Sequence, residues 1–149
     1  MFNPKAIIFD FNRTLYNPDS GFLVEGALEL LENLSKNFTL VLYSKDKSDR
    51  RKLISDLGID SFFKEIIVVE EKNPEDIQKV AEKLGVKTSE IVLIGDRIKS
   101  EVLAGKKAGC KTIWLKKGKF SEEFPENKEQ EPDAVISELL DVLLLIKKN

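Results

Sequence analysis

The chain has 149 residues, of which 42% are hydrophobic, and a net charge of −2, so it is long enough for one domain with a substantial core. This charge excludes the basic surface that nucleic-acid binding usually needs, and apolar runs this short exclude a membrane-spanning helix. With no histidine and a single cysteine, the chain lacks the usual zinc ligands. Any bound metal is expected to be an oxygen-liganded ion such as Mg²⁺.

The N-terminus reaches its first apolar run at residue 6, which leaves no room for a signal peptide. We therefore expect a cytoplasmic protein. Cys110 cannot form an intramolecular disulfide and is interpreted as a small buried hydrophobic residue.

Five short apolar runs predict five strands. They are nearly continuous in aliphatic and β-branched residues, as expected when helices cover both faces of a parallel sheet. In chain order they span residues 6–9, 40–43, 66–69, 91–94 and 112–115.

Helical patterns fill the gaps between these runs and predict an α/β fold with a doubly wound parallel sheet and right-handed crossovers. In the first pattern Leu28, Leu31 and Leu34 form one apolar stripe, and the third shows Asn73 as cap before Pro74. The segment 117–133 is polar and is expected to be a poorly ordered connection. The predicted helices span residues 24–37, 49–58, 73–85, about 98–108, and 133–148.

Polar side chains follow the predicted strands. In such a sheet ligands bind beyond the carboxyl ends of the strands, and the residues found there are Asp10, Ser44, Lys72 and Asp96. Each also has a purely structural interpretation: Asp10 could begin an Asx turn, Ser44 could be a turn residue, Asp96 could cap the following helix, and Lys72 could be an exposed lysine at a helix start. If these structural interpretations were all correct, the ordered pattern of four polar residues at the strand ends would be an accident. A shared site is therefore favoured.

The ordered motifs resemble the haloacid dehalogenase-like (HAD) superfamily of aspartate-nucleophile hydrolases. The match consists of "DFNRTL" at residues 10–15, Ser44 closing the second strand, Lys72 before the third long helix, and "GDRIKSE" at residues 95–101. It runs through nearly the whole chain and implies a three-layer, Rossmann-like, five-stranded sheet in the order 3-2-1-4-5.

The resemblance also implies a chemistry. Asp10 would be the nucleophile that forms an aspartyl-phosphate, and Mg²⁺ would be held by Asp10, Asp96, Glu101 and the backbone carbonyl of Asn12. Asp96 and Glu101 come from the fourth motif, and Glu101 could equally be a solvated helix residue paired with a neighbouring lysine.

Phosphate contacts are expected from the remaining motif residues. Ser44 would donate a hydrogen bond to a phosphoryl oxygen, and Lys72 would neutralise charge on those oxygens. The family pattern aligned on Pro74 places its lysine at position 71, which is Glu71 here, so Lys72 would act from one residue along. Thr14 would fix the loop.

Two neighbours of the motif residues complete the expected site. Lys45 follows Ser44 and Arg97 follows Asp96, and both are candidates for substrate binding. Arg13 lies where the family often has glycine.

Asn12 departs from the family pattern, in which a second aspartate protonates the leaving group. An amide cannot carry that proton, and general acid–base catalysis by such a residue typically increases the reaction rate about 10²–10⁴-fold. The sequence therefore predicts weak turnover of ordinary phosphomonoesters. The dehalogenase branch needs no Mg²⁺, and the presence of Asp96 and Glu101 argues against it.

Spacing predicts a molecule without a cap domain. One helix and one strand fill most of the interval between Asp10 and Ser44, and another pair fills the interval to Lys72. Capless members of the family take macromolecular substrates or form oligomers that close the site.

Two hypotheses follow: a Mg²⁺-dependent phosphatase or phosphotransferase weakened by Asn12, or a catalytically weak or silent protein that binds phosphate or a partner. A receiver-like phosphoacceptor domain is less favoured, because its aspartate follows the third strand, where this chain has Glu70 and Glu71.

Overall fold

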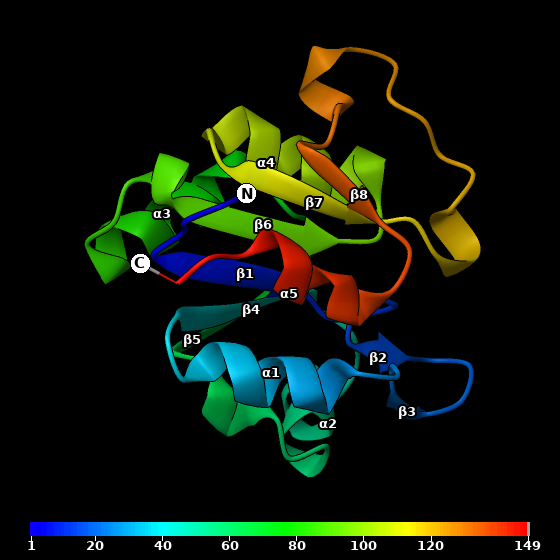
Figure 1. Ribbon diagram of the computed structural model, residues 1–149. Coiled ribbons are helices and arrows are strands. Elements are labelled where there is room, and N and C mark those ends of the chain that lie inside the picture. The colour runs from blue at the N-terminus through cyan, green and yellow to red at the C-terminus, as the bar shows by residue number, and fades with distance from the viewer. Residues whose placement is uncertain (149) are drawn as a thin grey trace.

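A computed structural model describes residues 1–148 and shows a three-layer α/β fold (Figure 1). Its main sheet has six parallel strands in the order β5-β4-β1-β6-β7-β8. The strands are β1 (Ala6–Asp10), β4 (Thr39–Lys45), β5 (Glu65–Val69), β6 (Ile91–Gly95), β7 (Lys111–Leu115) and β8 (Ala134–Ile136).

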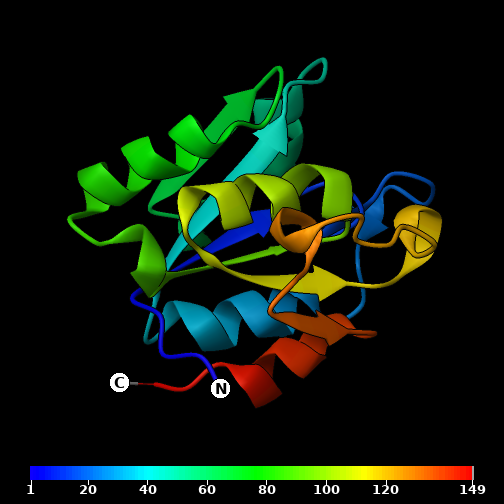
Figure 2. The same ribbon diagram turned by 90° about the horizontal axis from the view of Figure 1, so that it is seen from above.

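Two core clusters lie on opposite faces of this sheet. Ile7 and Phe9 of β1 pack into one cluster, and Ala6 and Ile8 pack into the other, because successive side chains of a strand point to opposite faces. Figure 2 shows α1 and α5 below the sheet and α3 and α4 above it. The helices are α1 (Ala27–Ser35), α2 (Arg50–Asp56), α3 (Pro74–Leu84), α4 (Leu103–Ala108) and α5 (Val142–Leu145).

The five predicted strands and their order are confirmed, and the sheet gains a sixth strand that the sequence analysis missed. The prediction of one long helix from residue 133 was wrong, because Ala134–Ile136 forms β8 and only Val142–Leu145 is α-helical. The Asp133 carboxylate accepts a 2.8 Å hydrogen bond from the Thr112 backbone N–H and so fixes this segment beside β7. Val135 is exposed while Ile136 is buried, the alternation of an edge strand.

Two finer expectations were also wrong. Leu28 is exposed on α1, and the buried positions of that helix are Ala27, Leu30, Leu31 and Leu34. The segment 117–133 was expected to lack order, but it holds two 3₁₀ turns, Gly118–Phe120 and Lys128–Gln130, and Glu123 accepts a hydrogen bond from Ile98 N. Cys110 is buried, as predicted.

Between β1 and α1 the chain forms a small antiparallel hairpin of β2 (Tyr16–Asn17) and β3 (Phe22–Leu23). This hairpin stands at the carboxyl end of β1 (Figure 1). Within residues 1–148, no helix has the length and apolar character needed to cross a bilayer.

Candidate active site

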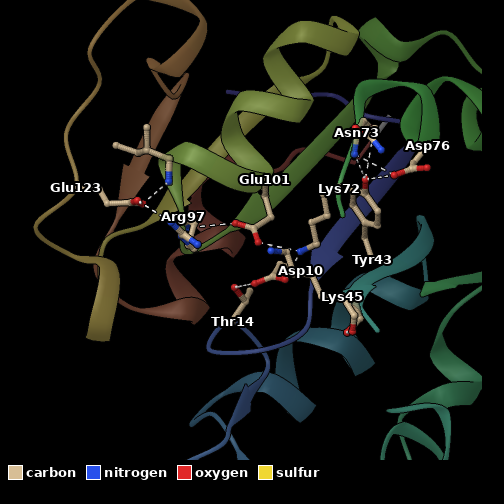
Figure 3. A network of polar contacts seen from close by, with 12 residues as sticks. Asp10, Thr14, Tyr43, Lys45, Lys72, Asn73, Asp76, Arg97, Glu101 and Glu123 are labelled. Carbon is tan, nitrogen blue, oxygen red and sulfur yellow. Dashed lines mark hydrogen bonds and ion pairs between the residues drawn. The ribbon is translucent and has the colours of Figure 1, made fainter. Parts of the chain in front are cut away.

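The carboxyl ends of β1, β4, β5 and β6 bring the predicted polar residues together, and Figure 3 shows Asp10, Lys72 and Glu101 among them. Asp10 is the last residue of β1, Ser44 lies near the end of β4, and Asp96 directly follows β6. All three are buried. They are adjacent because parallel strands in register end at the same edge of the sheet.

Asp10, Lys72 and Glu101 form a buried ion-pair network. The Lys72 ammonium donates hydrogen bonds to Asp10 Oδ1 and, over 2.8 Å, to Glu101 Oε1. The Lys72 side chain is 2% exposed. Burial alone lowers the pKa of this ammonium, but the charges of Asp10 and Glu101 outweigh it, and the pKa is raised above its ordinary value. Lys72 therefore stays charged.

Three carboxylates converge beside this lysine. One oxygen from each of Asp10, Asp96 and Glu101 lies within 4.8 Å of the others. Asp96 Oδ2 is buried with no hydrogen-bond partner in residues 1–148. Burial raises the pKa of Asp96, and the nearby charges of Asp10 and Glu101 raise it further. Burial and Asp10 likewise raise the pKa of Glu101. This crowding of like charges favours a bound cation.

The backbone between Gly95 and Glu101 places the Glu101 carboxylate beside Asp10 and Asp96. A Cβ at Gly95 would lie 2.8 Å from the Cβ of Glu101, closer than side chains pack. The Arg97 N–H donates to Glu101 Oε2 over 3.1 Å. Glu101 stands on a π-helical turn, Ile98–Val102, a geometry that is frequent at functional sites. Only glycine at position 95 permits this approach.

Lys72 is positioned by the start of α3. Asn73 and Asp76 form a capping box there, and the Tyr43 hydroxyl of β4 donates to Asp76 Oδ2 over 2.5 Å. The Tyr43 ring lies 5.1 Å from the Lys72 nitrogen. Glu71 is exposed, so the structure places Lys72 and not residue 71 inside the cluster.

The loop after β1 contributes a hydrogen bond that orients the Asp10 side chain. Thr14 is fully buried, and its hydroxyl donates to Asp10 Oδ2 over 2.9 Å. Arg13 has φ = 64°, the left-handed region that explains why glycine suits this position. Asn12 lines the cavity beside Asp10.

These residues surround a cavity of about 190 Å³. Ser44 lines it, although its hydroxyl donates to the Lys45 carbonyl over 3.0 Å, and the exposed Lys45 lies at its edge. A larger neighbouring cavity of about 480 Å³ contains none of the three carboxylates. The smaller cavity is lined by Asp10, Asn12, Arg13, Ser44, Lys45, Lys47, Arg50, Lys72, Asp96, Arg97, Ser100, Glu101 and Phe120.

Arg97 lines this cavity, but its guanidinium is engaged elsewhere. Its Nη2 lies 3.3 Å from Glu123 Oε2, and its Cζ lies 4.1 Å from the centre of the Phe120 ring. Glu123 also accepts a 2.9 Å hydrogen bond from Ile98 N. The segment after β7 thus contacts the loop that carries Arg97 and Ile98 and helps to fix its position. Nothing in the sequence pattern indicated this role for Glu123.

Arg50 was also missed. It is the first residue of α2 and lines the cavity, yet it is only 7% exposed. In sequence it is one charged residue in a run of charged residues. Its one distinguishing signal is its place six residues after Ser44, at the start of the helix that follows a predicted site strand.

Comparisons with known proteins support the assignment from the motifs. A family model described as "HAD-hyrolase-like" matches residues 72–142. The glyceraldehyde 3-phosphate phosphatase of Pyrococcus furiosus is 30% identical over 132 residues, covering 84% of this chain and 55% of that protein. The glyceraldehyde 3-phosphate phosphatase of Methanopyrus kandleri is 36% identical over 101 residues, covering 62% and 43%. The chain thus spans about half the length of these relatives.

A solved structure agrees. A HAD hydrolase of Bacillus subtilis bound to magnesium superposes with a TM-score of 0.72 and 25% identity, covering 84% of this chain and 56% of that one. With the ordered motifs at the strand ends, these similarities show that the chain belongs to the haloacid dehalogenase-like superfamily.

Proposed function

We propose that the protein is a Mg²⁺-dependent phosphatase or phosphotransferase that acts through an aspartyl-phosphate on Asp10. The observation that carries this proposal is the convergence of Asp10, Asp96 and Glu101 within 4.8 Å around a buried Lys72. The relatives named as glyceraldehyde 3-phosphate phosphatases support a phosphate ester as substrate. We further propose a single domain without a cap, so that the site is open to macromolecular substrates or is closed by a second copy.

The donor set fits Mg²⁺. The three carboxylates offer only oxygen, which Mg²⁺ prefers, and one oxygen of Asp96 is buried without a partner. With all three carboxylates ionised, they and the Lys72 ammonium carry two net negative charges, which a divalent ion would balance. Asp10, Asp96, Glu101 and the Asn12 carbonyl would hold the ion, whose charge would stabilise the phosphoryl oxygens.

The residues of the chain would divide the first step as follows. An oxygen of Asp10 attacks phosphorus, the new P–O bond forms, and the ester P–O bond breaks with its electron pair leaving on the alkoxide. Thr14 and Lys72, each hydrogen-bonded to one oxygen of Asp10, orient the nucleophile. Ser44 and Lys72 would contact the phosphoryl oxygens, whose charge is spread in the transition state. Water then attacks phosphorus, the P–O bond to Asp10 breaks, and inorganic phosphate leaves while the Asp10 carboxylate is restored.

Asn12 limits this cycle. Both halves need a proton transfer, first to the leaving oxygen and then from water, and an amide at position 12 supplies neither. Donors with good leaving groups would still form the aspartyl-phosphate. The proposed activity is therefore slow on simple esters.

A second candidate, a silent phosphate- or partner-binding protein, is favoured by the same Asn12. The two are separated by Asn12→Asp, tested with a panel of phosphomonoesters and Mg²⁺. We expect at least a tenfold gain in kcat, because the general acid is restored. Asn37→Asp makes the same change at an exposed, remote position and should have no effect. If neither the wild type nor Asn12→Asp turns over any ester, the enzyme proposal is wrong.

A further inference from the structure

Arg50 is a buried cation, and two of its three guanidinium nitrogens lack hydrogen-bond partners in residues 1–148. Its Nε and Nη1 are buried, and neither has a hydrogen-bond acceptor in residues 1–148. Its Cζ lies 4.8 Å from the centre of the Phe11 ring, which contacts one face of the guanidinium. Buried donors without acceptors cost free energy, so such groups call for an explanation.

The other buried or half-buried cations of the cavity each have an ion-pair partner, although Arg97 Nε is also buried without a hydrogen-bond partner in residues 1–148. Lys72 pairs with Asp10 and Glu101, Arg97 pairs with Glu123, and Arg13 pairs with Asp19 over 3.2 Å. Among the ion pairs of residues 1–148 there is none to Arg50. Burial lowers the pKa of its guanidinium, and the charges of Asp10 and Asp46 offset this effect only in part.

The cavity has more cations than its own acids need. Six Lys and Arg residues line it, and once Arg13 and Arg97 are set aside with their partners Asp19 and Glu123, four cations remain against three carboxylates. Three of the six lie close together in sequence: Lys45 ends β4, Lys47 is in the connection that follows, and Arg50 begins α2. A divalent ion at the carboxylates would raise the positive excess further.

We propose that Arg50, with Lys45 and Lys47 at the rim, forms a second anion subsite, and that the substrate is a phosphate ester carrying another anionic group, a carboxylate or a second phosphate. The unpaired guanidinium would bind this group while the phosphoryl group faces Asp10. This inference rests on the proposed function, because it places the phosphoryl group at the carboxylate cluster.

The test measures binding, so that it does not depend on turnover. Three non-hydrolysable probes are titrated with Mg²⁺ by calorimetry: ethylphosphonate with one anionic group, phosphonoacetate with an added carboxylate, and methylenediphosphonate with a second phosphonate. We expect the wild type to prefer at least one of the two-group probes by about tenfold, the usual effect of one charge-assisted contact. The preferred probe identifies the second group.

Variants assign the preference to Arg50. Arg50→Met should abolish it and change ethylphosphonate affinity less than about threefold, while Arg50→Lys should retain part of it. Arg51→Met removes the same charge from the exposed neighbouring position and should leave it intact. Thermal melts establish that each variant is folded.

Three results overturn the inference. The first is a wild type that binds ethylphosphonate but has no preference for a second group, which leaves the proposed function standing. The second is an Arg50→Met variant that keeps the preference. The third is a wild type that binds none of the probes with Mg²⁺, which overturns the proposed function as well.

Discussion

Two lysine–glutamate pairs at opposite ends of the same sheet have the same nitrogen–oxygen distance but differ in exposure to solvent. At the amino end, Lys5 and Glu90 precede β1 and β6, with a nitrogen–oxygen distance of 2.8 Å. At the carboxyl end, the Lys72–Glu101 pair also measures 2.8 Å. The first pair has side chains 59% and 29% exposed, and the second has side chains 2% and 5% exposed.

The difference shows where the fold holds charge at a cost to its stability. The exposed pair is screened by water and salt, so either member could be lost with little effect. The buried pair shares its space with Asp10 and Asp96, and removing charges from water is unfavourable unless each is well compensated. Such a cluster is a poor way to stabilise a sheet edge, which favours a role in binding.

The largest expected effect comes from removing the two lysines in turn. Lys72→Met leaves three buried carboxylates without their cation and should lower the free energy of unfolding by about 3–5 kcal/mol without Mg²⁺. Lys5→Met makes the same change at the exposed pair and should have a far smaller effect. Urea denaturation of both variants measures this. Equal losses would show that the comparison between the two ends is wrong.

A smaller effect of opposite sign is expected from Asp96→Asn, which removes one of the crowded charges. Without Mg²⁺ this variant should be more stable than the wild type by about 1 kcal/mol or more at neutral pH. The folded-state pKa of Asp96 is raised, so the protonated acid stabilises the fold at low pH and this stability is lost as pH rises. The gain from Asp96→Asn should therefore grow with pH.

The same variant tests the metal site. Mg²⁺ at about 100 times its Kd should stabilise the wild type by about 2.7 kcal/mol and stabilise Asp96→Asn much less. Asp133→Asn, a carboxylate of the remote β7–β8 edge, provides the control and should keep the full Mg²⁺ response. If all three proteins respond alike, the cluster is not where Mg²⁺ binds.

The central sheet and the positions of most candidate residues could be predicted because both depend on local patterns. Strands buried on both faces are continuous apolar runs, and parallel topology then brings Asp10, Ser44 and Asp96 to one edge. Lys72 was harder to place, because its position depends on how Tyr43 anchors the start of α3.

Features that depend on distant contacts could not be predicted. The strand β8 is held by Asp133 against Thr112, and no local pattern in a leucine-rich segment indicates this pairing. The partner of Arg97 is Glu123, 26 residues away in a polar segment. The burial of Arg50 likewise follows from packing against Phe11 and not from its neighbours in sequence.

The central claim, that Asp10 is a phosphoryl acceptor, is tested most directly by treating the protein with acetyl phosphate and Mg²⁺ and measuring its intact mass, followed by peptide mapping. The predicted result is one added phosphoryl group on Asp10 that depends on Mg²⁺, is absent in Asp10→Asn, and is long-lived because Asn12 cannot activate water. A phosphoryl group on another residue, or none under conditions where Mg²⁺ binds, would contradict the account.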